Sequence, residues 1–167
     1  MKLPLTYTDV NETGCCAVPN TADWDEKDIT FKDAQFIRMY TRSFLHIPLN
    51  MSQIMTKIQK VAEEARAGMP PKEVMILSHD VSPWKSEQLY RVSKAVAGAD
   101  NVTLSGRFLT KVFEGPYQNA KKWYDALQEF AKSKNEQVSD VYFFYTTCPK
   151  CAKHYGKNYT IGFAKVN

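Results

Sequence analysis

The sequence has no long apolar run. No stretch approaches the ~20 apolar residues that a membrane-spanning helix needs, and the first ten residues, MKLPLTYTDV, contain no apolar core of a secretory signal. We therefore expect a soluble cytoplasmic protein without a membrane partner. Thiols stay reduced in that compartment, so we expect the four cysteines to be free or metal-bound and not to form structural disulfide bonds.

The sequence also lacks a concentrated positive charge. The net charge is +4, and the lysines and arginines are scattered among acidic residues. A surface that binds nucleic acid usually carries a denser stripe of basic side chains. Direct DNA binding is therefore not expected.

Aromatic residues, by contrast, are abundant. The 167 residues include nine Phe, nine Tyr and three Trp, and 44% of all residues are hydrophobic. This length allows one domain or two small modules with a real core, which accounts for many of the aromatic rings. Aromatic side chains also line pockets for flat ligands, so both roles stay open for any single ring.

Hydrophobic periodicity predicts strands and helices in a repeating order. The expected elements are strand 36–45, helix 54–65, strands 74–81 and 89–96, then strand 102–113, helix 120–131 and strands 141–147 and 159–166. Three apolar helix positions recur 69 residues later, so that Ile54, Ile58 and Val61 correspond to Trp123, Leu127 and Phe130.

The recurrence predicts a duplicated strand–helix–strand–strand unit. The two pseudo-repeats cover residues 34–98 and 101–167, after an irregular N-terminal arm of residues 1–33 that packs on the domain. We expect an α+β fold in which the repeats join into one antiparallel sheet with both helices on one face. The opposite, concave face would be free to hold a ligand.

Residues 107–130, RFLTKVFEGPYQNAKKWYDALQEF, resemble the GyrI-like small-molecule-binding domains. Those domains have a strand ending in a Gly-Pro-Tyr turn, then an amphipathic helix carrying an aromatic residue, then a strand containing Tyr. The resemblance covers about residues 34–166 and includes the duplicated architecture. Cys15-Cys16 and the segment YTTCPKCAKHYGKNY at 145–159 mark a cysteine-containing branch, whose members carry GyrI-like or hydrolase-like labels.

The resemblance implies a stand-alone domain with an aromatic cleft between two pseudo-symmetric halves. Some members are effector domains of multidrug-responsive transcription activators, some inhibit DNA gyrase, and some hydrolyse cyclopropane-containing genotoxic natural products. The first 33 residues have no helical apolar period, so a complete transcription activator is not expected. The expected partner is a hydrophobic aromatic small molecule, bound by a monomer or homodimer. Hydrolysis of an electrophilic xenobiotic, non-enzymatic sequestration and contact with gyrase are the alternatives.

The implied cleft supplies the candidate ligand-binding residues. By position these are Tyr40, Trp84, Phe113, Trp123, Tyr142 and Phe144. Each ring could instead pack between helix and sheet, because alternate strand residues face opposite sides. Multidrug-binding members often carry a glutamate in the final strand, but residues 159–163 of this chain, YTIGF, contain no acid. That difference argues against tight binding of cationic drugs by the usual means.

Glu114 is the candidate catalytic base. It ends a predicted strand before a helix, and a carboxylate among aromatic rings can have a raised pKa and act on water. Tyr117 and Tyr145 would orient the water or protonate the leaving atom. The alternative for Glu114 is an exposed turn residue near a helix N-terminus. His46 and His79 are further candidates for proton transfer.

The cysteines fall in two pairs. Cys15 and Cys16 are adjacent in the arm, and Cys148 and Cys151 form a C-x-x-C pair in the last hairpin connection. Zinc takes four tetrahedral ligands, commonly thiolate or imidazole, so the two pairs would complete a site if the arm reached that connection. His154 is an alternative third ligand. A redox pair, or thiols that only fix the loop and arm, are the other readings. No cofactor is required, but a structural zinc, or a zinc or thiol sensor, would use these residues.

Overall fold

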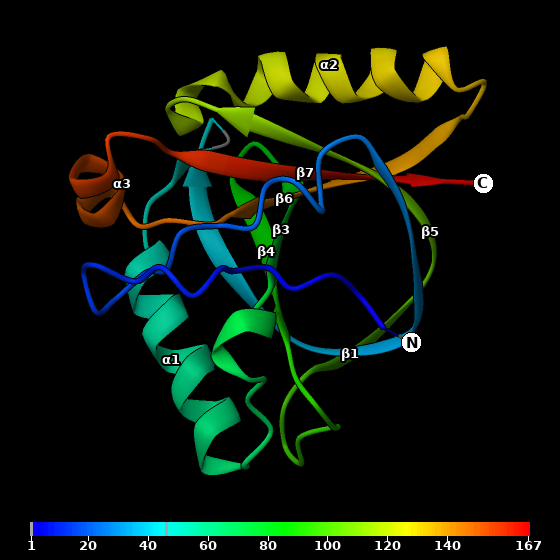
Figure 1. The fold of residues 1–167 in the computed structure, drawn as a ribbon. Coiled ribbons are helices and arrows are strands. Elements are labelled where there is room, and N and C mark those ends of the chain that lie inside the picture. The colour runs from blue at the N-terminus through cyan, green and yellow to red at the C-terminus, as the bar shows by residue number, and fades with distance from the viewer. Residues whose placement is uncertain (1, 46) are drawn as a thin grey trace. The chain divides into compact units, whose positions relative to one another are not determined.

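The computed structural model describes residues 2–45 and 47–167, so the proton-transfer candidate His46 lies outside the described residues. The elements in chain order are β1 (Lys27–Phe44), β2 (Ile47–Pro48), α1 (Met51–Glu64), η1 (Pro71–Glu73), β3 (Ile76–Ser82), β4 (Lys85–Arg91), β5 (Asn101–Glu114), η2 (Tyr117–Asn119), α2 (Ala120–Ser133), β6 (Val138–Tyr145), α3 (Pro149–Tyr155) and β7 (Tyr159–Val166) (Figure 1). Within this described part, every helix is too short or too polar to cross a membrane.

The chain forms two compact units. The central unit is Asp33–Ser105, and the terminal unit joins the residues up to Lys32 with Gly106–Asn167. The N-terminal arm therefore folds with the C-terminal half of the chain. Each unit has its own hydrophobic cluster and is described by itself.

In the central unit, β4 pairs antiparallel with both β1 and β3. The helix α1 buries Ile58 and Ala62 in a cluster with Ile37 of β1 and Tyr90 of β4. Ile37 and Tyr90 are directly opposite each other in the strand register, so both side chains face the helix. The helical spacing read from the sequence thus identifies the buried side of α1.

In the terminal unit, β7 pairs antiparallel with β5 and β6, and α2 lies along one face of these strands (Figure 1). The helix buries Trp123, Leu127 and Ala131. Gly162 of β7 permits this close packing, because an added Cβ there would lie 2.5 Å from Leu127 Cδ1.

The other face of the terminal strands is covered by the arm. The ring centroid of Trp24 lies 5.5 Å from that of Phe163, and the centroid of Phe31 lies 4.9 Å from that of Phe108. The Trp24 indole Nε1 donates a hydrogen bond to the Leu5 carbonyl at 2.9 Å. The sequence predicted a free face here; in the terminal unit that expectation is wrong, because apolar arm residues fill it.

Two local expectations also differ from the structure. The strand expected from Phe36 already begins at Lys27, because Phe31 and Ala34, which lie among charged residues of both signs, are buried strand residues. The connection after β6 was expected as a hairpin loop but contains the helix α3. Pro149 starts this helix with a preset φ, and Gly156 ends it in the left-handed region at φ 71°.

An α+β fold with antiparallel strands is confirmed. The strands and α-helices follow in the order β1, β2, α1, β3, β4 and then β5, α2, β6, α3, β7. The internal duplication, and the joining of the two repeats into one sheet, stay predictions.

Candidate functional site

Glu114 lies at the edge of an open depression in the terminal unit. It is the last residue of β5, its side chain is exposed, and it pairs with Tyr159 of β7. The depression has a volume of about 280 Å³ and is lined by Thr21, Ala22, Asp25, Val112, Glu114 and Tyr159. Val112 and Glu114 share a face because they are two residues apart in a strand. That face is the one covered by the arm.

The arm places a second carboxylate in this depression. Asp25 Oδ1 accepts a hydrogen bond from the Val112 backbone N–H at 3.0 Å, and the Asp25 N–H donates to the Thr21 carbonyl at 3.0 Å. Next to it, Lys111 Nζ lies 2.8 Å from Glu26 Oε1. The depression is thus lined by two acidic residues and a tyrosine, residue types that can position and deprotonate water.

Tyr145, a predicted partner of Glu114, faces the other way. In the strand register Tyr145 pairs with Thr160, and Thr160 pairs with Phe113, so these three residues share one face. Phe113 packs against the cluster beneath α2. The structure therefore does not bring Glu114 and Tyr145 together. Tyr117, the first residue of η2, is exposed.

The four candidate ligand residues of the terminal unit are divided between two faces. Phe113 of β5 and Trp123 of α2 stack where the helix packs on the strands, with centroids 5.7 Å apart and an interplanar angle of 16°. Tyr142 and Phe144 are buried on the arm side, where the Tyr7 and Phe144 centroids are 6.1 Å apart. A ligand that reached Phe144 would have to displace Tyr7 of the arm.

The candidate ligand residues of the central unit are exposed rings. Tyr40 is 40% exposed and Trp84 is 56% exposed. The Lys85 ammonium lies 4.0 Å from the centroid of the Tyr40 ring, and the Trp84 centroid lies 5.7 Å from that of Phe44. A flat cation on Tyr40 would compete with Lys85 for the ring face.

His79, a proton-transfer candidate, belongs to a chain of charged groups in the central unit. Its Nδ1 lies 2.9 Å from Glu87 Oε1, and Glu87 Oε2 lies 3.2 Å from the Arg38 guanidinium. Arg38 Nε also donates to Asp100 at 2.9 Å. The hydrogen bond from His79, and then the one from Arg38, lower the pKa of Glu87 below its ordinary value.

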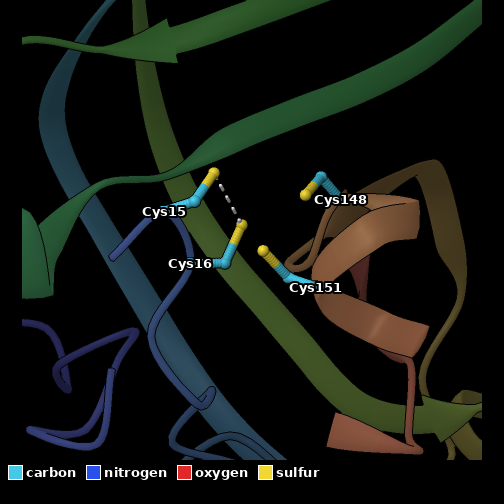
Figure 2. A group of neighbouring side chains, drawn as sticks. All are labelled: Cys15, Cys16, Cys148 and Cys151. Carbon is cyan, nitrogen blue, oxygen red and sulfur yellow. Dashed lines mark hydrogen bonds between the residues drawn. The ribbon is translucent and has the colours of Figure 1, made fainter. Parts of the chain in front are cut away.

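The four cysteines meet in the terminal unit, as Figure 2 shows. Cys15 and Cys16 come from the arm, Cys148 is the N-cap residue of α3, and Cys151 is in its first turn. All four Sγ atoms lie within 4.8 Å of one another, and the Cys15 and Cys16 Sγ atoms are 3.8 Å apart. All four thiols are free.

Hydrogen bonds dock the arm on α3. The Tyr155 hydroxyl donates to the Cys16 carbonyl at 2.8 Å and accepts from the Glu12 N–H at 3.0 Å. His154 Nε2 lies 3.2 Å from a Glu12 carboxylate oxygen. His154 is thus paired with Glu12 and is not part of the thiol group, so the structure brings together the four cysteines but not the C-x-x-C-x-x-H set.

The pKa values of two of the thiols are shifted in opposite directions. A hydrogen bond with the Thr13 hydroxyl is the main cause that lowers the pKa of Cys151 to about 7, with smaller contributions from the other thiols. Burial raises the pKa of Cys16 above its ordinary value. A lowered thiol pKa favours the thiolate, the form that binds a metal or acts as a nucleophile.

Sequence reasoning missed four residues of these arrangements: Asp25, Tyr159, Glu87 and Thr13. Asp25 and Thr13 lie in the arm, whose contacts depend on long-range packing. Tyr159 could have been found, because it begins the strand that follows the cysteine connection. Glu87 could have been found from its alternation with Lys85 and Leu89 in a strand.

A family model described as bacterial hydrolase matches residues 6–166. No curated protein matches the chain. Similar solved structures include an uncharacterized conserved protein from Listeria innocua, with TM-score 0.62, 11% identity, and 84% of this chain and 91% of that chain covered. A hydrolase from Listeria innocua is also similar, with TM-score 0.62 and 11% identity. The match covers 86% of this chain and 92% of that chain.

A third similar structure is a putative bacterial transcription regulation protein from Staphylococcus aureus MU50, with TM-score 0.52, 10% identity, and 86% of this chain and 99% of that chain covered. At these identities the likeness is one of fold. Together with the family match, it confirms the GyrI-like resemblance read from residues 107–130. Because the family model spans nearly the whole length, the chain belongs to the bacterial hydrolase family.

Proposed function

We propose that the chain is a small-molecule-binding domain that hydrolyses an electrophilic, largely apolar compound at the Glu114 depression. The observation that carries the proposal is the meeting of Glu114, Asp25 and Tyr159 around one open depression in a member of a hydrolase family. The GyrI-like resemblance implies cyclopropane-containing xenobiotics as the substrate class.

In the proposed reaction Glu114 acts as the general base. Its carboxylate takes a proton from water while the water oxygen bonds to a carbon of the strained ring. The ring C–C bond breaks, and its electron pair passes into the conjugated carbonyl of the substrate. The phenol of Tyr159 or Tyr117 donates a proton to that anion, and the proton on Glu114 then returns to the phenolate through solvent. The net reaction is addition of one water molecule.

Tyr145 has no role in this mechanism, because it faces the opposite side of the strands from Glu114. Asp25 has a positioning role. Its Oδ1 already accepts the Val112 N–H, and a carboxylate oxygen can also accept a hydrogen bond from the attacking water. Tyr40 and Trp84 are exposed rings of the central unit; they stay predicted ligand contacts and are not assigned to the Glu114 depression.

The test is turnover of a cyclopropane-containing substrate by the wild-type chain and by Glu114→Gln. We expect the variant to bind the substrate but to lose turnover by at least ~100-fold, the lower range for loss of general base catalysis. Glu129→Gln is the matched control, because Glu129 is an exposed glutamate of α2, and it should retain turnover. Full activity in Glu114→Gln would contradict the mechanism. Saturable binding without turnover by the wild type would favour sequestration.

A further inference from the structure

We propose that Cys15, Cys16, Cys148 and Cys151 bind one Zn²⁺ ion, which clasps the N-terminal arm to α3. The proposal is independent of the hydrolytic reaction, since it concerns residues outside the Glu114 depression. Zinc binding converts the four thiols to thiolates, and the protons leave to solvent. The product is a tetrathiolate centre that links two segments distant in the sequence.

The sulfur positions fit a zinc ligand shell. Zinc–thiolate bonds are about 2.3 Å long, so neighbouring sulfurs of a tetrahedral centre lie ~3.8 Å apart. The Cys15 and Cys16 Sγ atoms are 3.8 Å apart, and every other pair lies within 4.8 Å. The remaining pairs therefore need to contract by no more than about an ångström, which a rotation of side chains can supply.

The backbone conformation on both sides brings the four thiols close together. Adjacent cysteines diverge in an extended chain, but Thr13 Oγ1 accepts both the Cys15 N–H at 3.3 Å and the Cys16 N–H at 3.2 Å. Gly14, at φ 72°, provides the bend between them and Thr13. On the other side, Cys148 and Cys151 are three residues apart at the start of α3 and so share a helix face.

Burial and charge also suit a bound ion. Cys151 is buried, Cys16 and Cys148 are half-buried, and Cys15 is exposed, so the ion has a route of entry beside Cys15. A tetrathiolate zinc centre carries a net charge of about −2 because four thiolates outweigh the cation. Lys150 and Lys153 supply two positive charges on the same short helix.

The consequence of the clasp is a more rigid arm. Residues 8–18 form a loop closed by two backbone hydrogen bonds, Thr8 N–H to Val18 carbonyl at 2.9 Å and Val18 N–H to Val10 carbonyl at 2.8 Å. Beyond the thiols, Tyr155 and the His154–Glu12 contact hold this loop on α3. Removal of the ion should therefore loosen the loop before the rest of the unit.

Elemental analysis and thiol titration of the full chain purified under reducing conditions test the site. We expect one zinc per chain, thiols that react only after chelation, and with Co²⁺ the charge-transfer absorption of a tetrahedral thiolate centre. Cys15→Ser should weaken zinc binding beyond the ~10–100-fold effect of losing an outer-shell partner. His154→Ala should still bind one zinc. Four reactive thiols with no uptake of added Zn²⁺, or a disulfide within the group, would overturn the proposal.

Hydrogen exchange tests the clasp itself. With zinc removed, the Thr8 and Val18 amides should exchange faster while those of α2 stay unchanged. Cys15→Ser keeps the proposal testable if Cys151→Ser fails to fold, because Cys15 is exposed and contributes no core packing. Equal exchange of Thr8 and Val18 with and without bound zinc would contradict the clasp.

Discussion

Gly162 lets α2 pack directly on β7. An added Cβ would lie 2.5 Å from Leu127 Cδ1 and 3.1 Å from Phe113 Cε2, so side chains on both sides would have to move. We expect Gly162→Ala to lower the free energy of unfolding by ~1–3 kcal/mol, as overpacking of a core usually does. Chemical denaturation measures the change. Gly68→Ala is the control, because no atom lies within 4 Å of its added Cβ, and an equal loss in both variants would contradict the packing argument.

We expect the free energy of unfolding to decrease at low pH because Glu87 becomes protonated. Its pKa in the folded state lies below the ordinary value of 4.5, because His79 and Arg38 hold the charged form. The charged Glu87 carboxylate therefore makes its full contribution to the free energy of unfolding above pH 4.5. This contribution is lost as the pH falls through the lowered pKa of Glu87.

In Glu87→Gln this titration is absent, so the free energy of unfolding should fall less steeply on acidification below pH 4.5 than in the wild type. Denaturation curves at a series of pH values measure it. Glu64→Gln is the control, since the Glu64 side chain is 67% exposed and 3.9 Å from Lys60. A Glu87→Gln variant with the wild-type acid dependence would contradict this assignment.

At the scale of elements, the N-terminal arm acts as part of the core. Trp24 is fully buried on the terminal strands, and the Thr110 hydroxyl donates to its carbonyl at 2.5 Å. Trp24→Ala should lower the free energy of unfolding by ~3–5 kcal/mol, the usual cost of removing a buried tryptophan. Thermal or chemical unfolding measures it.

Trp84→Ala is the matched control for the arm. Trp84 is 56% exposed, so its loss should change the free energy of unfolding by no more than ~0.5 kcal/mol. A small effect of Trp24→Ala would show that the arm does not belong to the core.

The sequence predicted the strongly periodic elements better than the irregular ones. The stripe of Ile58 and Ala62 in α1 and that of Trp123 and Leu127 in α2 both face a core, because helical spacing alone sets which side is buried. The early start of β1 was missed, since charged residues of both signs interrupt the apolar alternation of its first residues. The helix α3 was missed because seven residues give too short a period to recognise.

At the scale of the whole molecule, the α+β class and the GyrI-like resemblance were predictable from residues 34–166. The candidate site was predictable only in part. The four cysteines and Glu114 could be chosen by residue type and position. Asp25 could not, because its place beside Val112 depends on an arm that returns across the terminal unit. For the same reason the burial of Phe144 under Tyr7 could not be read from alternation in a strand.

The central claim is that the substrate binds and reacts at the Glu114 depression. Hydrogen exchange of Glu114→Gln, with and without a cyclopropane-containing substrate that this variant leaves unreacted, tests it most directly. The account predicts slower exchange in residues 21–25, at the end of β5 and at Tyr159 when the substrate is bound. Protection confined to the segments around Tyr40 and Trp84, with none beside Glu114, would contradict it.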